Sequence, residues 1–502
     1  MRGVYDEIAA AAPVIAQGGP RAAAVACGSA TTLAAAVAAL EAGGTAVDAA
    51  IAAGFAAAVG EPTLSSLGGG GFLLVREPGE DPVISDFFVD VPGLGAGDRT
   101  PHVETLAVTF ASGVEQVFHA GWGSVATPGC LPGYLQALGQ WGRLSLAEVL
   151  APAIAAARDG VLLDDVQVQF IEVIGAILRI TPQSAALYDP VLAGERFRNP
   201  EYADLLQSMV DGAVTGADDP RFIDPIDEAM RTHGGIVTRE DLVTYRPIER
   251  SPISLRRGDA TIWTNPAPSF GGGIVLDALE RTPRSADPTV LWPAVLSALR
   301  EVTKERRERD RTDGGTQVIR GTTHVSVVDS EGRVAALSMS NGSGSGVVVE
   351  GISFNNMLGE EDLNPHGPHG EHGLTPGSRM GSMMAPSVVI RDDGDILVAG
   401  TGGSERIRSA LASTFARHLD LGLSPAEAIA APRLHAAADL NEVEPGLPSA
   451  VLAALHEAPA RLREWPAPDL FFGGVHAVRR TADGTVEAIG DARRGGAVAV
   501  VE

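Results

Sequence analysis

The sequence predicts an α+β protein whose sheets are built from antiparallel hairpins. Three observations predict this class. Residues 22–75 form an apolar block with two helices and a glycine-rich turn, residues 136–245 are mostly helical, and hairpin signals are concentrated in the last third. Long helical stretches that alternate with groups of hairpins are typical of α+β proteins.

The first block begins with a strand at residues 22–27. A buried helix over residues 29–42 follows and ends at Gly43–Gly44, since glycine readily adopts the backbone conformation that terminates a helix. A second helix begins at Thr45 and runs to about residue 59, and residues 67–75 form a glycine-rich turn that enters a strand. Because few charges interrupt this block, we expect it to be buried on several sides.

The middle of the chain begins with strands and long loops over residues 76–135. Helices are predicted through residues 136–245, with loops at 189–199 and 212–220. Strand and turn return at 250–275, where two prolines and three consecutive glycines indicate a turn. A helix is predicted over 288–309, and the charged residues of 303–320 predict a solvated, mobile segment.

Hairpins dominate the last third. Residues 322–328 and 334–340 are predicted strands on either side of an Asp-Ser-Glu-Gly turn, and residues 387–390 and 396–399 flank an Asp-Asp-Gly turn. Residues 341–380 are rich in loops. Helices are predicted at 404–419 and 424–432, and the last strands at 474–480 and 485–489.

Length and charge restrict the classes of function. The 502 residues correspond to two to four domains at ~100–200 residues each, and a hydrophobic fraction of 45% supplies a core. The net charge is −25 and Lys304 is the single lysine, so the basic clusters that nucleic acids and anionic membranes require are missing. The sequence has no membrane-spanning run and no clear signal peptide. We therefore expect a cytoplasmic protein without nucleic-acid or membrane partners.

Three other groups of residues carry no function on this reading. The glycines at 68–71 lack the pattern of a phosphate-binding loop, which favours close backbone packing. The histidines at 366, 369 and 372 lie among glycines and prolines, so a surface loop is favoured over a metal site. Cys27 and Cys130 could pair, but two buried apolar side chains are favoured. The prediction is that the protein needs neither a metal nor a cofactor.

Residues 321–326 (GTTHVS) carry the hydroxyl groups best suited to catalysis. They follow the charged segment and begin a predicted strand, where β-propensity alone explains a threonine. A cut before Thr322 would give this residue a second property, because its new α-amino group could accept the proton of its own hydroxyl. The charged segment is where such a cut is tolerated.

Nine segments in register give the chain a resemblance to the γ-glutamyltranspeptidase family of N-terminal-nucleophile hydrolases, over residues 22–495. The segments that resemble the family are 43–51 (GGTAVDAAI), 67–72 (LGGGGF), 127–129 with Gly133, 155–160 (AAARDG), 266–273 (PAPSFGGG), 322–329 (TTHVSVVD), 355–362 (NNMLGEED), Gly402–Gly403 and Pro432–Arg433.

The resemblance implies a four-layer αββα sandwich and a self-processing enzyme. The precursor would cut itself between Gly321 and Thr322 into a large subunit, 1–321, and a small subunit, 322–502, which remain one compact unit. Thr322 would then attack a γ-glutamyl amide such as glutathione, and water or an amino acid would resolve the acyl-enzyme.

The resemblance also assigns site residues. Ser340 stands at the position of a hydroxyl near the threonine amine, and Asn341 at that of a polar substrate contact. The main-chain N–H groups of Gly402 and Gly403 match an oxyanion hole, which agrees with the close approach that glycine permits.

Substrate binding is assigned to five further residues. Glu360, Glu361 and Asp362 are candidates to pair with the amine of a glutamyl group, and Ser382 matches one serine of the carboxylate site. Residues 86–92 (DFFVDVP) contain no arginine where the family holds the carboxylate, and Arg99 is the candidate substitute. Two alternatives therefore stay open: an amidohydrolase of the cephalosporin-acylase type with a non-glutamyl acyl donor, and an uncut, inactive relative that acts as a binding protein.

Overall fold

Two seven-stranded sheets face each other in this computed structural model, which describes residues 12–109, 115–310, 321–360 and 374–502. The first sheet has the order β1 (Val14–Gly18), β20 (Val486–Gly490), β19 (Gly474–Arg480), β15 (Ile396–Gly402), β14 (Ser387–Arg391), β9 (Ala260–Thr264) and β8 (Ile253–Arg257). The second has the order β21 (Ala497–Val501), β2 (Ala23–Cys27), β10 (Gly321–Val328), β11 (Val334–Gly342), β3 (Gly70–Arg76), β4 (Val83–Phe87) and β7 (Ile248–Arg250).

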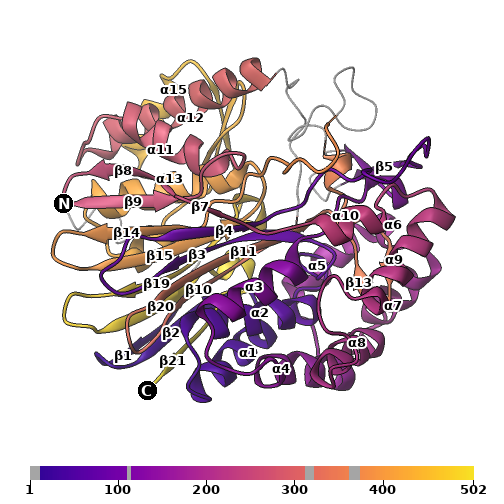
Figure 1. The fold of residues 1–502 in the computed structure, drawn as a ribbon. Coiled ribbons are helices and arrows are strands. Elements are labelled where there is room, and N and C mark those ends of the chain that lie inside the picture. Colours follow the sequence, from indigo (N-terminus) through magenta and orange to yellow (C-terminus); the bar gives the residue numbers. More distant parts are fainter. Residues whose placement is uncertain (1–11, 110–114, 311–320, 361–373) are drawn as a thin grey trace.

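Helices cover the outer faces of both sheets, so the molecule is the αββα sandwich that the resemblance implies (Figure 1). The second sheet is covered by α1 (Ala30–Glu41), α2 (Ala46–Gly60), α3 (Cys130–Trp141) and α4 (Leu146–Asp159). The first is covered by α11 (Gly271–Arg281), α12 (Pro288–Asp310) and α13 (Arg406–Leu419), with α14 (Pro425–Ala430) and α15 (Ser449–His456) beside them.

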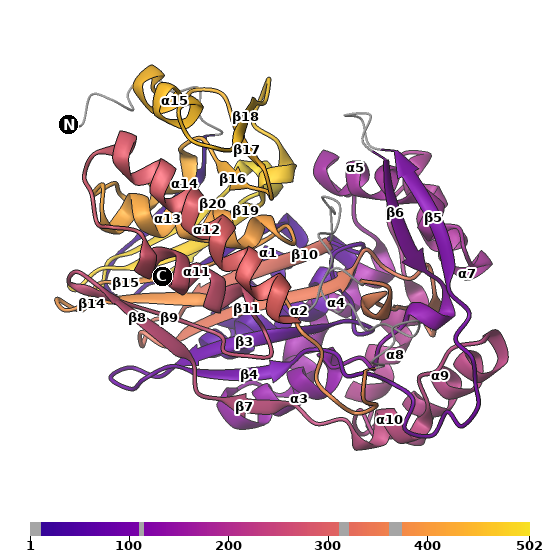
Figure 2. The same ribbon diagram turned by 90° about the horizontal axis from the view of Figure 1, so that it is seen from above.

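A lobe of short helices lies at one end of the sandwich (Figure 2). It consists of α5 (Asp165–Val173), α6 (Gly175–Leu178), α7 (Pro182–Leu192), α8 (Pro200–Val210), α9 (Pro220–His233) and α10 (Arg239–Thr244). Three small sheets complete the described ranges: β5 (Glu104–Thr109) with β6 (Glu115–Ala120), β12 (Val348–Val349) with β13 (Ile352–Ser353), and β16 (Leu434–Ala436), β17 (Leu440–Val443) and β18 (Arg461–Glu464).

The N-terminal helices form where the sequence predicts them, for the predicted reasons. Ser29 caps α1, and Thr45 caps α2 in a box with Asp48 that satisfies main-chain N–H groups at the start of the helix. Gly43 follows α1 with a φ of +82°, a conformation that few other residues adopt. Every residue of α2 is buried, which confirms the predicted burial of this block.

Several boundaries differ from the prediction. The glycines at 271–273 begin α11 rather than a turn, and glycine is required at the first of them because a Cβ on Gly271 would lie 1.9 Å from the Met383 carbonyl oxygen. Helix α12 continues to Asp310, so residues 303–310 are helical, while 311–320 lie outside the described residues. The predicted loop at 189–199 begins only after α7 ends at Leu192. Strands β1 and β21 were not predicted. They form by pairing with the neighbouring strands β20 and β2.

The two predicted subunits are interleaved in both sheets. Strand β10 pairs with β2 and β11 pairs with β3, so residues on both sides of position 321/322 share one hydrogen-bonded sheet. The first sheet likewise joins β9, from the earlier segment, to β14 from the later one. A cut at this position would therefore leave both pieces in one fold.

Alternation along β10 sets the direction of its side chains. Val325 and Val327 pack into the core beneath the α1–α2 layer. His324 and Ser326 face the opposite sheet, where Ser326 donates to the carbonyl of His476 and the His324 ring fills the space beside Gly400. By the same alternation Thr322 faces the first sheet.

Candidate active site

A β-bulge lies at the predicted cleavage site. Gly321 pairs with Gly342 and Thr322 pairs with Ser340, which leaves Asn341 as an extra residue on β11. A bulge interrupts the regular hydrogen-bond ladder and redirects the side chains beside it. The peptide bond between Gly321 and Thr322 therefore lies where the sheet is irregular.

Ser340 connects the Thr322 hydroxyl to the carbonyl of this bond. The Thr322 Oγ1 donates to the Ser340 Oγ over 3.2 Å, and the Ser340 Oγ donates to the Gly321 carbonyl oxygen over 2.5 Å. The Gly342 N–H donates to the same Ser340 Oγ over 2.9 Å. The Ser340 hydroxyl thus donates one hydrogen bond and accepts two, which is its full capacity. Ser340 thereby polarises the Gly321 carbonyl while it accepts from the nearest hydroxyl.

Glycine at position 321 is required by its neighbours. A Cβ there would lie 2.7 Å from the Thr63 carbonyl oxygen and 2.9 Å from that of Gly342. The chain before Thr322 is thus held between the α2–β3 connection and the end of β11.

The other face of β10 is tied to α2. Thr323 Oγ1 donates to the Glu61 carboxyl over 2.5 Å, and Thr32 Oγ1 donates to it over 2.7 Å. Burial raises the pKa of Glu61 to about 7, although these hydrogen bonds act to lower it. Sequence reasoning missed Glu61, whose signal was an acidic residue directly after a helix with a single charged side chain.

Gly402 and Gly403 lie beside the main chain of Thr322, where the sequence analysis placed an oxyanion hole. A Cβ on Gly402 would stand 1.9 Å from the Thr322 carbonyl oxygen, so only glycine permits this approach. Gly403 has a φ of +124° and leads through Ser404 to the N-terminal end of α13. Their role as oxyanion donors stays a prediction.

A small recess opens beside Thr322, with about 280 Å³ of empty volume; we call it the Thr322 recess. Ser340, Glu360 and Ser382 line it, so three predicted site residues meet Thr322 there. The remaining lining residues, which sequence reasoning missed, are Phe88, Met357, Met383, Met384, Ser404 and Ile407. Phe88 belongs to the segment in which the family resemblance placed an arginine.

Of the three remaining predicted substrate residues, the structure describes Arg99 alone. Glu361 and Asp362 lie outside the described residues, as do the histidines at 366, 369 and 372. Arg99 follows a loop held against α10, where the Asp241 carboxylate accepts from the Gly93 and Leu94 N–H groups. Arg99 is not among the described residues that line the Thr322 recess.

Arg379, an arginine with a buried side chain near the lining residues of the Thr322 recess in the sequence, forms ion pairs with Asp86 and Asp90. Its guanidinium donates to the Asp90 carboxylate and to both the carboxylate and carbonyl oxygens of Asp86, and it packs on the Tyr245 ring. It therefore holds the end of β4 to the 374–380 segment.

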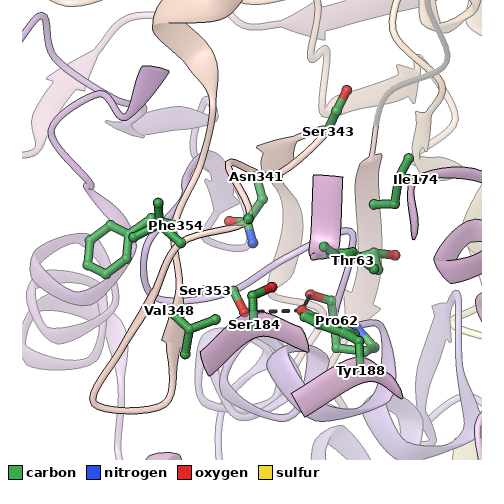
Figure 3. Close-up of a pocket in the computed structure, with 14 residues that line it drawn as sticks. Pro62, Thr63, Ile174, Ser184, Tyr188, Asn341, Ser343, Val348, Ser353 and Phe354 are labelled. Atoms are coloured by element: carbon green, nitrogen blue, oxygen red, sulfur yellow. Dashed lines mark hydrogen bonds between the residues drawn. The ribbon is translucent and has the colours of Figure 1, made fainter. Parts of the chain in front are cut away.

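Asn341 is not among the described residues that line the Thr322 recess with Ser340. It lines a second recess with about 250 Å³ of empty volume, together with Thr63, Ser184 and Ser343 (Figure 3). We call this the Asn341 recess. Ser340 and Asn341 thus line different recesses, and the role of Asn341 as a polar substrate contact stays a prediction.

The cysteines are buried free thiols, as the sequence favours. Burial raises the pKa of the Cys130 thiol to about 12, which makes it a poor nucleophile. Across the described ranges no group of three or more His, Cys, Asp or Glu side chains could hold a metal ion. No helix in those ranges is long and apolar enough to cross a lipid bilayer.

Comparison with known proteins assigns the chain to the family that its sequence resembles. Residues 32–289 and 289–501 match the protein family described as "Gamma-glutamyltranspeptidase". The chain belongs to the gamma-glutamyltranspeptidase family. Within this family the chain is 27% identical to a glutathione hydrolase proenzyme of Escherichia coli (strain K12), over 79% of this chain and 78% of that protein.

Acylases are also relatives of this gamma-glutamyltranspeptidase-family chain. It is 27% identical to the Acylase ACY 1 proenzyme of Pseudomonas sp. (strain SE83), over 89% of this chain and 88% of that protein. The fold matches the crystal structure of a cephalosporin acylase from Bacillus halodurans with a TM-score of 0.77, at 24% identity over 97% of this chain and 96% of that one. The fold and the family predicted from the sequence are thus confirmed.

Proposed function

We propose that the protein is a self-processing γ-glutamyl transferase and hydrolase that acts through Thr322 on γ-glutamyl amides such as glutathione. The observation that carries the proposal is the Ser340 hydroxyl, which contacts both the Thr322 hydroxyl and the Gly321 carbonyl oxygen. A nucleophile and a polarised carbonyl thus share one hydrogen-bonding partner in the uncut chain.

Self-cleavage would proceed in two steps. The Thr322 Oγ1 attacks the Gly321 carbonyl carbon, the C–N bond breaks, and the Thr322 nitrogen takes the proton from the hydroxyl. The resulting ester joins Gly321 to the Thr322 oxygen, and water hydrolyses it to the Gly321 carboxylate and a free Thr322 hydroxyl. The products are residues 1–321 and 322–502, held together by the shared sheets.

The new N-terminus would then act on substrate. Its α-amine accepts the Thr322 hydroxyl proton as the oxygen attacks the donor amide carbonyl, then passes that proton to the amide nitrogen, which leaves as the free amine while the acyl group stays on Thr322. Gly402 and Gly403 N–H groups stabilise the oxyanion, and water or an amino acid takes the acyl group from Thr322. Family membership and the glutathione hydrolase relatives support this donor class.

The test is the intact mass of the incubated protein, followed by turnover of L-γ-glutamyl-p-nitroanilide. Fragments that divide at Gly321/Thr322, with turnover of that donor, would support the proposal. The Thr322→Ala variant should stay a single chain and show no turnover, because it lacks the attacking oxygen. A wild-type chain that stays whole would contradict the proposal and support an inactive binding protein.

A second candidate keeps Thr322 but changes the acyl donor. Five apolar side chains line the Thr322 recess, and among its described lining residues Glu360 is the one charged group. A donor carboxylate buried beside Glu360 would lack a cation, which is unfavourable. The acylase relatives fit a non-glutamyl amide in this recess. A higher kcat/KM for butyryl-p-nitroanilide than for the γ-glutamyl donor would favour this candidate.

A further inference from the structure

Arg494 is a buried arginine whose two terminal nitrogens have no hydrogen-bond partner among the described residues. It is 4% exposed and lies in the short turn after β20. Its Nε donates to the Leu470 carbonyl over 3.2 Å, and its guanidinium lies over the Phe170 ring. Buried polar groups in native proteins are nearly always hydrogen-bonded, so two free Nη groups on one buried cation call for an explanation.

The guanidinium of Arg494 lies against the two predicted oxyanion glycines. A Cβ on Gly402 would stand 3.1 Å from the Arg494 Nη1 and 1.9 Å from the Thr322 carbonyl oxygen. A Cβ on Gly403 would stand 3.4 Å from the Arg494 Nη2, and the stem of the side chain packs on Gly474. Arg494 and the main chain of Thr322 therefore face the same side of Gly402.

Arg494 keeps its positive charge at neutral pH. Burial lowers its pKa from 12.5 only to about 10, so the guanidinium stays protonated in the working range of most enzymes. The acid nearest to it in the chain is Asp491, whose carboxylate is already paired with Arg433 at 2.6 Å and with Arg493 at 3.1 Å. Asp491 therefore compensates two other cations, and the charge of Arg494 is largely uncancelled.

Other titratable groups around this region cancel little of that charge. Asp469 is half-buried and caps the turn at Leu470–Phe472, and burial raises the pKa of Glu61 to about 7, so its carboxyl is mostly neutral below that pH. His324 and His476 are neutral because burial lowers their pKa. Glu360 lines the Thr322 recess and acts in the opposite sense to a cation.

We propose that Arg494 keeps the α-amine of cleaved Thr322 free of a proton at neutral pH, so that the amine can act as the base of turnover; this inference rests on the proposed function. An ordinary α-amine has a pKa of about 7.7–8.0 and is mostly protonated at pH 7. A cation in a region of low dielectric disfavours a second positive charge nearby. Arg494 touches no substrate in this role, so it is a positioning residue.

The test compares Arg494→Lys with Arg494→Met, because both lose the packing of the guanidinium but Arg494→Lys alone keeps the charge. The measurement is kcat/KM against pH for L-γ-glutamyl-p-nitroanilide, or for the butyryl donor if that is the better substrate. Its acid limb reports the proton on the essential base. Titration of the donor's own amine is the same for every variant, so a difference between variants belongs to the enzyme.

We expect the acid limb of the wild type at about pH 7 and that of Arg494→Met about one pH unit higher. The kcat/KM of Arg494→Met should therefore fall about tenfold at pH 6 and approach the wild-type value above about pH 9. Arg494→Lys should keep the wild-type limb. Arg143→Met is the control for net charge, since Arg143 is exposed and paired with Glu331, and its limb should not move.

Melting temperatures identify a variant that fails to fold, and Arg494→Gln is then the second neutral variant. The wild type also tests the inference alone, because an acid limb at about pH 8 or above would show an ordinary α-amine and overturn it.

Three results with the variants would also overturn the inference. One is an unchanged limb in a folded neutral variant, and another is an equal shift in Arg494→Lys and Arg494→Met, which would assign the effect to packing. The third is a folded neutral variant that stays uncut, since no free amine takes part in self-cleavage. A wild-type chain that stays whole would instead reject the proposed function itself, so the two failures are distinguishable.

Discussion

The Ser340 Oγ donates a hydrogen bond to the Gly321 carbonyl oxygen. The same Ser340 Oγ accepts a hydrogen bond from the hydroxyl of the next residue, Thr322. This relationship exists because a bulge sets Thr322 opposite Ser340 and Gly321 opposite Gly342. A regular ladder would have placed Asn341 opposite Gly321 and turned its side chain to the other face. The bulge therefore creates the site from residues that the sequence spaces 18 to 19 positions apart.

We expect Ser340→Ala to slow self-cleavage about 100-fold, since removal of one donor to a developing oxyanion has effects of this order. Ser340→Thr keeps the hydroxyl and should recover most of the rate. The measurement is the half-time of fragment formation by mass spectrometry. Equal rates for Ser340→Ala and wild type would show that the hydrogen bond to Gly321 does not assist the reaction.

Gly402→Ala should abolish self-cleavage or slow it severely, because the added Cβ would stand 1.9 Å from the Thr322 carbonyl oxygen and must displace main chain. We expect a loss of about 1–3 kcal/mol in unfolding free energy as well. Gly139→Ala is the control: Gly139 lies in α3 with nothing within 4 Å of an added Cβ. That variant should cleave normally, and a cleaving Gly402→Ala would refute the close approach.

Glu61 should make the stability of the uncut protein depend on pH. Burial raises its pKa from 4.5 to about 7, so the folded chain binds this proton more tightly than the unfolded chain. The resulting stabilisation is complete below about pH 4.5 and is lost as pH rises to about 7, a change of about 3 kcal/mol. Glu61→Gln does not titrate and should lack this decline.

Urea unfolding at pH 5 and pH 8 measures the effect, in a Thr322→Ala background so that both chains stay whole. Relative to Glu61→Gln, the wild-type Glu61 chain should lose stability between these pH values. The same change in unfolding free energy between pH 5 and pH 8 in both chains would mean that Glu61 keeps an ordinary pKa despite its burial.

Chelation should leave both reactions unchanged. In self-cleavage the hydroxyl proton passes to the departing Thr322 nitrogen, and in turnover the proposed base is the free α-amine of Thr322, so neither reaction needs a metal-bound water. We expect equal rates before and after dialysis against EDTA. Activity that is lost on dialysis and returns with a divalent cation would contradict this mechanism.

Local patterns in the sequence predict most elements of this fold because their causes are local. The capping residues Ser29 and Thr45, the glycines after α1 and the turn between β10 and β11 act over a few residues, and the corresponding elements appear where predicted. Strands β1 and β21 have no comparable local signal. They exist because the edges of β20 and β2 offer unpaired main-chain groups.

The contact between Thr322 and Ser340 was likewise predictable, since one hairpin brings these two residues together. Most residues that line the Thr322 recess could not be predicted from the sequence. Phe88 lies about 300 positions before Met383 and Ile407 in the chain, and none of the three carries a chemical signature of its own.

The sequence by itself thus determined the family, the fold class and most of its elements, because these depend on residue types at short spacing. Only the tertiary structure decided which face each side chain occupies. It placed Asn341 and Ser340 in different recesses, tied Thr323 to Glu61 and left Arg99 outside the Thr322 recess. The physical reason is that a single bulge and the packing of two sheets set these directions, and neither is encoded in local spacing.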